Sequence, residues 1–261
     1  MPTRIENKLT ASEERPLIAP SILSADFCDL GAECEHVLRP VDQEGAGADL
    51  LHVDVMDGHF VPNLSLGPAI VSSLRKRLPE AFLDVHIMVT DPWQYAAAFA
   101  EAGADHLTFH AEPAMNKRAG TGMSPMSEGY DPIHLADRIR SLGMSAGLAI
   151  NPPTNVRDVD KLLGGDGSGT GQWNAFDLIN IMSVNPGYAG QAFIASSLNA
   201  ARTVRFWLGA ERRVQIDGGV APDNAKRVRD AGVDVLVAAS AIFGKPREER
   251  PEIVRTLRSG G

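Results

Sequence analysis

The chain has 261 residues, of which 44% are hydrophobic and 22% charged, and its formal net charge is −8 at pH 7. This is the composition of a soluble globular protein whose core is large enough to fold without disulfides or metal staples. The acidic balance disfavours nucleic acid as a partner, and no apolar run reaches the ~18 residues that would span a membrane.

The N-terminal segment, residues 1–16, is polar and lacks the apolar stretch of a signal peptide, so a cytoplasmic protein is expected. The sequence then divides into this extension and one folded domain, residues 17–261. Cys28 and Cys34 lie six residues apart in a predicted helix. We interpret them as small apolar residues of a reducing compartment, in preference to a disulfide or a metal-binding pair.

Short apolar runs alternate with helical segments along the whole chain. Eight strands are predicted, at residues 16–23, 49–56, 82–89, 105–112, 144–151, 177–184, 213–220 and 233–240. Helical spacing with Asp at the start or Gly at the end predicts helices at residues 29–38, 91–103, 131–143 and 222–232. Such alternation indicates right-handed βαβ units and a parallel sheet. Eight units, with no GxGxxG after the first strand, predict a single-domain (β/α)8 TIM barrel instead of an open sheet.

Three connections are longer than a barrel requires. Residues 39–47 and 164–175 lead from a helix into a strand, so we expect them at the N-terminal face. Residues 112–132 leave a strand and are expected at the C-terminal face, where barrel enzymes carry their chemistry. Their Gly, Ser and Pro content favours a loop that borders the active site or builds a subunit contact. A surface insertion without function is the alternative.

The segment HVDVMDGHF (52–60) places ionisable residues at the end of an apolar strand. The two-residue period of a strand puts His52 and Asp54 on one face, and Asp84 and His86 share a face in the next strand. Asp217 ends the seventh strand. Each residue alone has an ordinary explanation, as a hydrogen-bonded core residue or a turn former. Together they form what we call the four-residue cluster: His52, Asp54, His86 and Asp217.

Burying these four side chains unpaired in one barrel mouth would be costly, because isolated charges lose their hydration. A divalent cation that took all four as ligands would remove this cost. Two carboxylates and two imidazoles suit Zn²⁺, Mn²⁺ or Fe²⁺ better than Ca²⁺ or Mg²⁺. The cluster therefore predicts a metal site that also performs acid–base chemistry.

Other ionisable residues have structural explanations. Asp57, followed by Gly58, predicts a turn. His110, which ends the fourth strand, is left open between packing and chemistry. Surface or packing roles are expected for the remaining histidines: His36, His59, His106 and His134.

The other half of the predicted barrel mouth is rich in glycine. NPGYAGQ (185–191), DGG (217–219) and AASAIFG (238–244) follow the sixth, seventh and eighth strands. Glycine leaves backbone N–H groups free to approach an anion, and the following helix adds its dipole. The loops after strands seven and eight are the recurrent phosphate site of this fold. The pattern predicts a phosphate-binding half.

These segments resemble the ribulose-phosphate 3-epimerase family over about residues 17–245. The resemblance rests on APSILSADF (19–27), HVDVMDGHFVPN (52–63), DVHIMV (84–89), GLAINP (147–152), MSVNPGYAGQ (182–191), DGG (217–219) and SAIF (240–243). The order and spacing of HVDVMDGHFVPN and VNPGYAGQ are specific to this family.

The resemblance implies an enzyme that interconverts D-ribulose 5-phosphate and D-xylulose 5-phosphate by inversion at C3 through an enediolate. By this likeness Asp54 and Asp217 are the acid/base catalysts, and the four-residue cluster binds one divalent metal ion, Zn, Mn or Fe. The metal would act as a Lewis acid. The expected partner is a small sugar phosphate, and the expected assembly is a homo-oligomer.

The resemblance also assigns substrate-binding residues: Ser21, Met56, His86, Met88, Met182, Gly187, Gly190, Gly218, Gly219 and Ser240. Two positions depart from the family, which has glycine where this chain has Ala189 and Ala239. Either the backbone tolerates the added methyl groups with a modest loss of affinity, or the phosphate site has changed.

Three alternatives remain. One is an epimerase of a related ketose phosphate such as D-allulose 6-phosphate, which would need the same carboxylate pair. Another is a decarboxylating barrel with an Asp-x-Lys motif, which Asp54-Val55-Met56 does not match. The third is a barrel without catalysis, which retention of the whole four-residue cluster disfavours.

Overall fold

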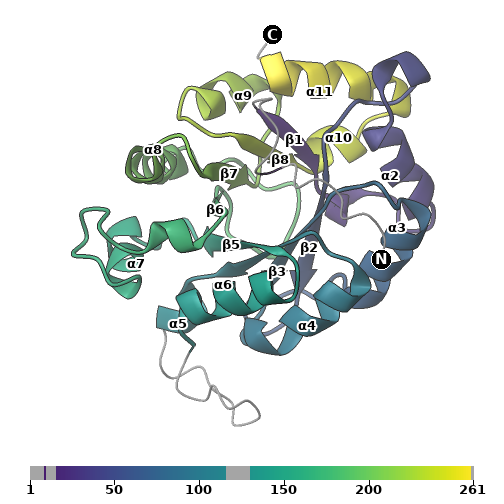
Figure 1. The fold of residues 1–261 in the computed structure, drawn as a ribbon. Helices are drawn as coiled ribbons and strands as arrows, with labels where there is room; N and C mark the ends of the chain where they lie inside the picture. Colours follow the sequence, from purple (N-terminus) through teal and green to yellow (C-terminus); the bar gives the residue numbers. More distant parts are fainter. Residues whose placement is uncertain (1–8, 10–15, 116–129, 260–261) are drawn as a thin grey trace.

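The computed structural model of the chain describes residue 9, residues 16–115 and residues 130–259. Eight parallel strands form one sheet in the order β1-β8-β7-β6-β5-β4-β3-β2 (Figure 1). A parallel bridge between Ser21 and His52 brings β2 back against β1 and completes the barrel. The strands are β1 (Leu17–Pro20), β2 (Leu51–Met56), β3 (Leu83–Met88), β4 (His106–His110), β5 (Ser145–Ile150), β6 (Leu178–Met182), β7 (Arg213–Asp217) and β8 (Val235–Ala238).

Helices surround the barrel and connect its strands (Figure 1). The α-helices are α2 (Leu30–Leu38), α3 (Pro68–Arg77), α4 (Pro92–Ala102), α5 (Glu112–Met115), α6 (Pro132–Ser141), α7 (Val156–Leu162), α8 (Ser197–Leu208), α9 (Pro222–Arg229), α10 (Ser240–Phe243) and α11 (Arg250–Ser259). Short 3-10 helices are η1 (Ile22–Ser24), η2 (Val41–Gln43), η3 (Trp173–Ala175) and η4 (Arg247–Glu249). The predicted single-domain (β/α)8 TIM barrel is confirmed. All eight predicted strands are present, each shorter than predicted by up to three residues at an end.

Side-chain hydrogen bonds shape the chain ahead of two of the helices, α6 and α2. Asp131 caps α6, because its side chain accepts from the Ile133 N–H at 2.8 Å. The prediction that both cysteines lie in one helix is wrong for Cys28, since α2 begins only at Leu30. The side chain of Asp26 accepts from the Cys28 N–H at 2.9 Å, which forms a turn ahead of the helix. Cys28 is exposed, whereas Cys34 is buried in α2.

The N-terminal end of the barrel is closed by apolar side chains. One buried cluster contains the first residues of three strands together with neighbouring residues, namely Leu9, Leu17, Ala19, Leu50, Phe82, Leu178, Val235 and Val237. Nε of Arg213 donates to the carbonyl of Leu9 at 2.7 Å. The predicted polar extension, residues 1–16, otherwise lies almost wholly outside the described residues. Because apolar side chains fill the N-terminal end, the C-terminal end is the side where polar side chains gather.

The long connections lie where their direction predicts. Residues 39–47 join α2 to β2 and residues 164–175 join α7 to β6, both at the N-terminal face. Buried Asp160 organises the second of these, since its carboxylate accepts from the N–H of Gly171 at 2.8 Å and from Nε1 of Trp173 at 2.6 Å. The predicted insertion, residues 112–132, begins with α5 at the C-terminal face, and its residues 116–129 lie outside the described part.

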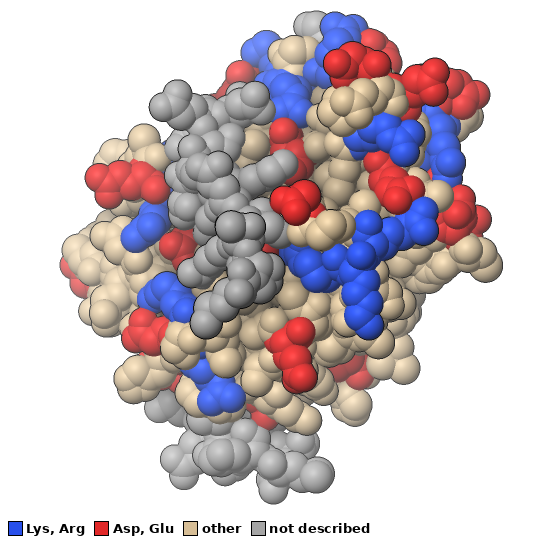
Figure 2. Space-filling model, turned by 45° about the vertical axis from the view of Figure 1, so that its right-hand side comes forward, with Lys and Arg blue, Asp and Glu red and all other residues tan. Residues whose placement is uncertain are grey.

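Surface charge is mixed in sign. Figure 2 shows basic and acidic side chains intermingled on the face that it presents. Ion pairs tie neighbouring elements together: Arg77 lies 2.9 Å from Glu35, and Arg247 lies 2.8 Å from Glu33. Within residues 16–115 and 130–259, no helix is both long enough and apolar enough to cross a bilayer.

Candidate active site

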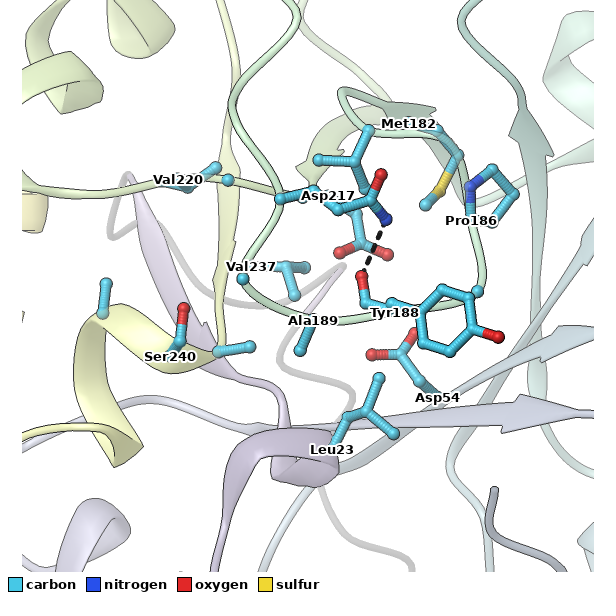
Figure 3. Close-up of a pocket in the computed structure, with 18 of the residues that line it drawn as sticks. Leu23, Asp54, Met182, Pro186, Tyr188, Ala189, Asp217, Val220, Val237 and Ser240 are labelled. Carbon is cyan, nitrogen blue, oxygen red and sulfur yellow. Dashed lines mark hydrogen bonds between the residues drawn. The ribbon is translucent and has the colours of Figure 1, made fainter. Parts of the chain in front are cut away.

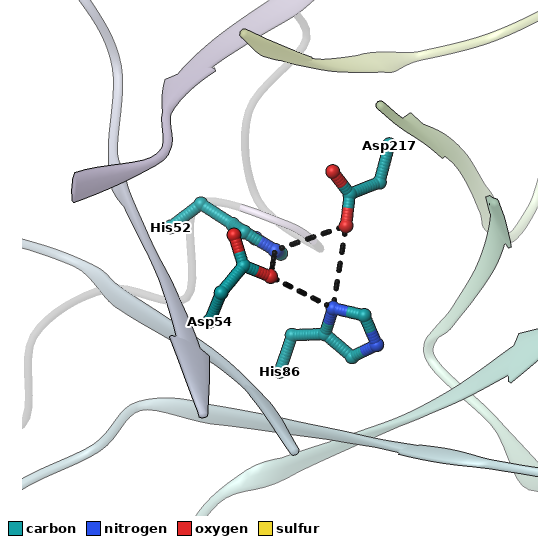
Figure 4. Close-up of side chains that lie close together, drawn as sticks. All are labelled: His52, Asp54, His86 and Asp217. Carbon is teal, nitrogen blue, oxygen red and sulfur yellow. Dashed lines mark hydrogen bonds and ion pairs between the residues drawn. The ribbon is translucent and has the colours of Figure 1, made fainter. Parts of the chain in front are cut away.

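The four-residue cluster brings together His52 and Asp54 from β2, His86 from β3 and Asp217, the last residue of β7 (Figure 4). One ligand atom from each side chain lies within 4.8 Å of the other three, and all four residues are buried. Asp54 Oδ1 lies 3.2 Å from His52 Nε2 and 3.1 Å from His86 Nδ1. Asp217 Oδ2 lies 3.4 Å from His52 Nε2 and 3.2 Å from His86 Nδ1. The two nitrogens and two oxygens therefore alternate around a common centre.

The donor set of this cluster fits a divalent cation. Nε2 of His52 and Oδ2 of Asp217 are buried and make no well-directed hydrogen bond to any described residue, although they lie in ion-pair contact. Buried polar atoms in proteins are almost always satisfied, so atoms aimed at a shared centre indicate a missing partner there. Two imidazole nitrogens and two carboxylate oxygens are ligands that Zn²⁺, Mn²⁺ and Fe²⁺ accept.

The protonation of the cluster is governed by the opposite charges within it. Burial alone would lower the pKa of His52, but the charges of Asp54 and Asp84 raise it well above its usual value. Burial would raise the pKa of Asp54, but the charge of His52 and hydrogen bonds from His52 and His86 hold it below its usual range. Burial and the charge of Asp54 also act to raise the pKa of Asp217, and hydrogen bonds from the histidines outweigh them. The histidines and carboxylates thus stabilise one another's charged forms, and a divalent cation bound here would replace the second proton of each imidazole.

Neighbouring side chains orient the cluster. Nδ1 of His52 lies 2.7 Å from Oδ2 of Asp84, which leaves Nε2 free to face the cluster. Ser21 Oγ donates to Asp54 Oδ2 at 2.5 Å. Nε2 of His86 lies 2.9 Å from Nε2 of His110, so the histidine that the sequence left open touches the cluster. Sequence reasoning placed Asp84 on the same strand face as His86 but gave it no role. Its role depends on the register of β2 and β3, in which Asp84 and His52 are partners, and the sequence does not specify that register.

The other histidines have the roles that were expected of them. His106 is buried between Ser145 and Thr108, with hydrogen bonds of 2.7 and 3.0 Å. His59 and His134 are exposed, whereas His36 is largely buried in α2. The predicted turn at Asp57 is also present, since Asp57 Oδ1 accepts from the backbone N–H of His59 at 2.8 Å.

A pocket of ≈ 250 Å³ opens beside the cluster (Figure 3). Asp54 and Asp217 both line it, whereas Ser21, His52 and His86 lie behind these carboxylates and are not part of its wall. Predicted substrate residues that line the pocket are Met56, Met88, Met182, Gly187, Gly190, Gly218, Gly219 and Ser240. The pocket therefore joins the two carboxylates to the glycine-rich loops.

Side-chain hydrogen bonds hold the loop after β6 over this pocket. Asn63 Nδ2 donates to the carbonyl of Gly187 at 2.7 Å, and Tyr188 Oη donates to the carbonyl of Pro62 at 2.7 Å. Gln191 Nε2 closes the loop on itself by donating to the carbonyl of Tyr188 at 2.8 Å (Figure 3). The loop is thus fixed both internally and to the segment that follows β2.

Space and backbone angle require glycine at one pocket position in particular. Gly219 has a φ of +67°, and a Cβ there would lie 2.8 Å from the backbone nitrogen of Phe193. At the two departures from the family pattern the backbone is compatible with alanine. Ala239 has a φ of −103°, and Ala189 is not among the positive-φ residues, because Glu44 is the one described non-glycine residue with positive φ. Both alanines line the pocket, so their methyl groups narrow it.

The fold and the pocket define a (β/α)8 barrel enzyme with a pair of carboxylates at its mouth. A sequence model described as the ribulose-phosphate 3 epimerase family matches residues 17–243. The chain belongs to this family and is an epimerase. Among its relatives are the ribulose-phosphate 3-epimerases of Synechocystis sp. (40% identical, 88% of each chain), Serratia marcescens (40%, 88% of this chain and 96% of that one) and Bacillus subtilis (37%, 92% and 97%).

Solved structures with low sequence identity share the fold alone. The 3-keto-L-gulonate-6-phosphate decarboxylase from Vibrio cholerae superposes with a TM-score of 0.61 at 16% identity, over 94% of this chain and 97% of that one. The 3-hexulose-6-phosphate synthase from Salmonella typhimurium gives 0.60 at 15% identity, over 94% and 97%.

Proposed function

We propose that this chain interconverts D-ribulose 5-phosphate and D-xylulose 5-phosphate by moving protons at C3 with Asp54 and Asp217. One observation carries the proposal: two buried carboxylates from different strands line one pocket and share the same two imidazoles. Inversion needs one group to remove a proton and another to return a proton from the opposite face. Asp54 and Asp217 stand on β2 and β7, which β1 and β8 separate in the sheet, and so reach the pocket from different sides.

Reversible epimerisation starts with one carboxylate ionised and the other protonated. Asp54 holds its charge, because Ser21 donates to it and both histidines face it. The pKa of Asp217 is lowered as well, because hydrogen bonds from His52 and His86 outweigh burial and the charge of Asp54. The carboxyl that abstracts the C3 proton in one direction of the reaction is the one that returns it in the other.

The four-residue cluster would hold one divalent cation, Zn²⁺, Mn²⁺ or Fe²⁺. When bound, such a cation supplies Lewis acidity that stabilises negative charge on the substrate oxygens. Met56 and Met88 form an apolar wall of the pocket beside the carboxylates. They are 5% and 1% exposed and pack together. A dry wall of this kind strengthens the electrostatic interactions of the enediolate.

The glycine-rich loops after β6, β7 and β8 would receive the substrate phosphate. Gly187, Gly190, Gly218 and Gly219 carry no side chain that would block an anion from the backbone N–H groups. Ser240 begins α10 in the same pocket wall. Ala189 and Ala239 line the same pocket.

Deuterium exchange tests the proposal directly. Purified protein supplied with Zn²⁺, Mn²⁺ or Fe²⁺ is mixed in D₂O with D-ribulose 5-phosphate and, separately, with D-allulose 6-phosphate, and NMR follows each sugar. We expect deuterium at C3 and the appearance of D-xylulose 5-phosphate. Exchange only with D-allulose 6-phosphate would assign the alternative ketose phosphate. Prior removal of metal with a chelator should abolish exchange, and unchanged exchange after verified removal would contradict the metal role.

Two other readings make different predictions. A barrel without catalysis would bind metal and exchange neither sugar. A decarboxylating barrel would release carbon dioxide from a β-keto acid phosphate, but Met56 stands where its lysine is expected. The expected homo-oligomer is likewise a proposal, which sedimentation of the purified chain would test.

A further inference from the structure

A chain of polar contacts leads away from the four-residue cluster through β4. Nδ1 of His86 faces the cluster, and Nε2 of the same ring lies 2.9 Å from Nε2 of His110. Nδ1 of His110 in turn lies 3.1 Å from Oε2 of Glu112 at the start of α5. Both rings are at most 1% exposed, and the Glu112 side chain is 14% exposed. The contacts therefore run in sequence from a carboxylate, through one imidazole, to a second imidazole that belongs to the cluster.

Glu112 is held as an acceptor at both oxygens. Its Oε1 accepts from the backbone N–H of Asn151 at 2.7 Å, while Oε2 faces His110. Burial acts to raise the pKa of Glu112, but hydrogen bonds from His110 and Asn151 hold it below its usual value. The side chain is ionised, and an ionised carboxylate can only accept.

This fixes where the protons of both rings lie. Since Glu112 only accepts, Nδ1 of His110 carries a proton. The two Nε2 atoms lie 2.9 Å apart, and a hydrogen bond between them needs one donor and one acceptor. Because the proton of His110 is on Nδ1, facing Glu112, its Nε2 is the acceptor and Nε2 of His86 is the donor. A neutral His86 that donates from Nε2 has its lone pair on Nδ1, which points at the carboxylates of the cluster.

We propose that Glu112 and His110 are positioning residues that fix the tautomer and orientation of His86, so that its Nδ1 lone pair is presented to a divalent cation in the four-residue cluster. The inference rests on the metal-binding part of the proposed function. Neither residue lines the pocket, so they act through His86 and do not touch the substrate.

The contacts that run from Glu112 through His110 to His86 form what we call the relay. The surroundings of His110 hold it in place. The ring of Phe60 lies 4.8 Å from the His110 ring, and the centroids of the His86 and His110 rings are 5.0 Å apart, as an edge-to-edge contact through the two Nε2 atoms requires. Tyr130 Oη donates to the carbonyl of His110. His110 is thus held at both ring nitrogens and packed against Phe60, which keeps Nδ1 facing Glu112 and Nε2 facing His86.

The two histidines of the cluster therefore turn different ring nitrogens toward its centre, because different partners bind their other nitrogens. Asp84 contacts Nδ1 of His52 directly at 2.7 Å, so His52 presents Nε2. His86 presents Nδ1, because its Nε2–H donates to Nε2 of His110. Carboxylate partners behind metal-binding histidines are a general device for setting tautomer, and their loss typically lowers metal affinity about 10–100-fold. In this chain one support is direct and the other passes through a second imidazole.

The wild-type protein provides the first test, by ¹⁵N NMR of [¹⁵N]histidine-labelled, Zn²⁺-loaded chain. We expect His110 to be protonated at Nδ1, and His86 to be protonated at Nε2 with Nδ1 bound to zinc. A His110 protonated at Nε2 would overturn the relay. This measurement needs no variant and does not depend on activity.

The second test is the affinity for Zn²⁺ of Glu112→Gln, measured by competition with a chelator. An amide has one acceptor oxygen, so it cannot accept from both Asn151 and His110, and its NH₂ group favours the opposite His110 tautomer. We expect the affinity to fall about 10–100-fold. Asp160→Asn is the matched control, since Asp160 is, like Glu112, a carboxylate that accepts from backbone N–H groups, but it lies at the opposite end of the barrel. Its Zn²⁺ affinity should be unchanged.

The outcomes separate the relay from the proposed function. Equal affinity in Glu112→Gln and wild type, or equal losses in Glu112→Gln and Asp160→Asn, would overturn the relay while leaving the metal site intact. A wild-type chain that binds none of Zn²⁺, Mn²⁺ and Fe²⁺ would remove the metal-binding part of the proposed function, and the relay with it.

Discussion

One half of the barrel mouth is formed by side chains and the other half by backbone. The half at β2, β3 and β7 is made of side chains, whose nitrogen and oxygen atoms alternate around one centre. The half after β6, β7 and β8 is made of backbone, with positive φ at Gly187, Gly190, Gly218 and Gly219. The change occurs between two consecutive residues, since Asp217 belongs to the first half and Gly218 to the second. The side-chain half should therefore depend on residue chemistry and the backbone half on residue shape.

The largest expected effect falls on the side-chain half. Asp54→Asn and Asp217→Asn each keep the size of the side chain but remove a proton carrier and an anionic ligand. We expect each to lower kcat at least about 1,000-fold, as loss of general acid–base catalysis does. The measurement is turnover of D-ribulose 5-phosphate at saturating metal, with metal content determined for each variant. Near-normal turnover in either one would contradict the two-carboxylate mechanism.

The backbone half can be tested with a pair of identical substitutions. Gly219→Ala places a Cβ 2.8 Å from the Phe193 nitrogen at a φ of +67°, whereas Gly190→Ala has a φ of +78° and no atom within 4 Å. Backbone strain and displacement of the Phe193 segment in Gly219→Ala should weaken the free energy of substrate binding by about 2 kcal/mol, which corresponds to about a 30-fold rise in KM. Gly190→Ala should raise KM by a smaller factor, because only its backbone is strained. Equal effects would mean that φ alone, and not the approach of the Phe193 segment, limits the loop.

Asp57, in the turn that follows β2, should contribute to the stability of the fold. Asp57 accepts from the backbone N–H groups of His59, Phe60 and Thr90 at 2.8 Å each. Burial acts to raise its pKa, but these bonds hold the pKa of Asp57 below its usual value. Asp57→Asn loses acceptor capacity, and we expect the free energy of unfolding to fall by about 1 kcal/mol at pH 7, because the side chain is partly exposed.

The sign of the pH dependence follows from the lowered pKa. The contribution of Asp57 is present above the pKa of the unfolded chain, about 3.9, and is lost as pH falls through the lower folded value. The difference in urea unfolding between wild type and Asp57→Asn should therefore shrink below about pH 4. A difference that stayed constant would show that the turn depends on shape and not on charge. Metal affinity should not change, because Asp57 is outside the four-residue cluster.

The same contrast explains what the sequence could and could not predict. Strand periodicity fixes which residues share a face, and barrel topology brings strand ends together, so the four-residue cluster follows from position alone. The partners behind it do not. Whether Asp84 meets His52, and whether His110 lies between His86 and Glu112, depends on strand register and side-chain rotamers that periodicity does not specify. At the backbone half, glycine spacing indicated a phosphate site, but the residues that fasten the loop, such as Asn63, lie 124 positions away from it.

The smallest expected effect concerns Ala189 and Ala239. It tests whether the backbone half accepts alanine at these two positions, as their φ angles suggest. Ala189 and Ala239 both lie outside the positive-φ region, so alanine costs these positions no conformational strain. Ala189→Gly and Ala239→Gly should therefore change KM for D-ribulose 5-phosphate less than about threefold, with kcat unchanged, since a threefold change is well below 1 kcal/mol. A larger fall in KM, together with new turnover of D-allulose 6-phosphate, would show that the two methyl groups set the length of the pocket. In that case residue shape would decide specificity in the backbone half, while the side-chain half would still decide the reaction.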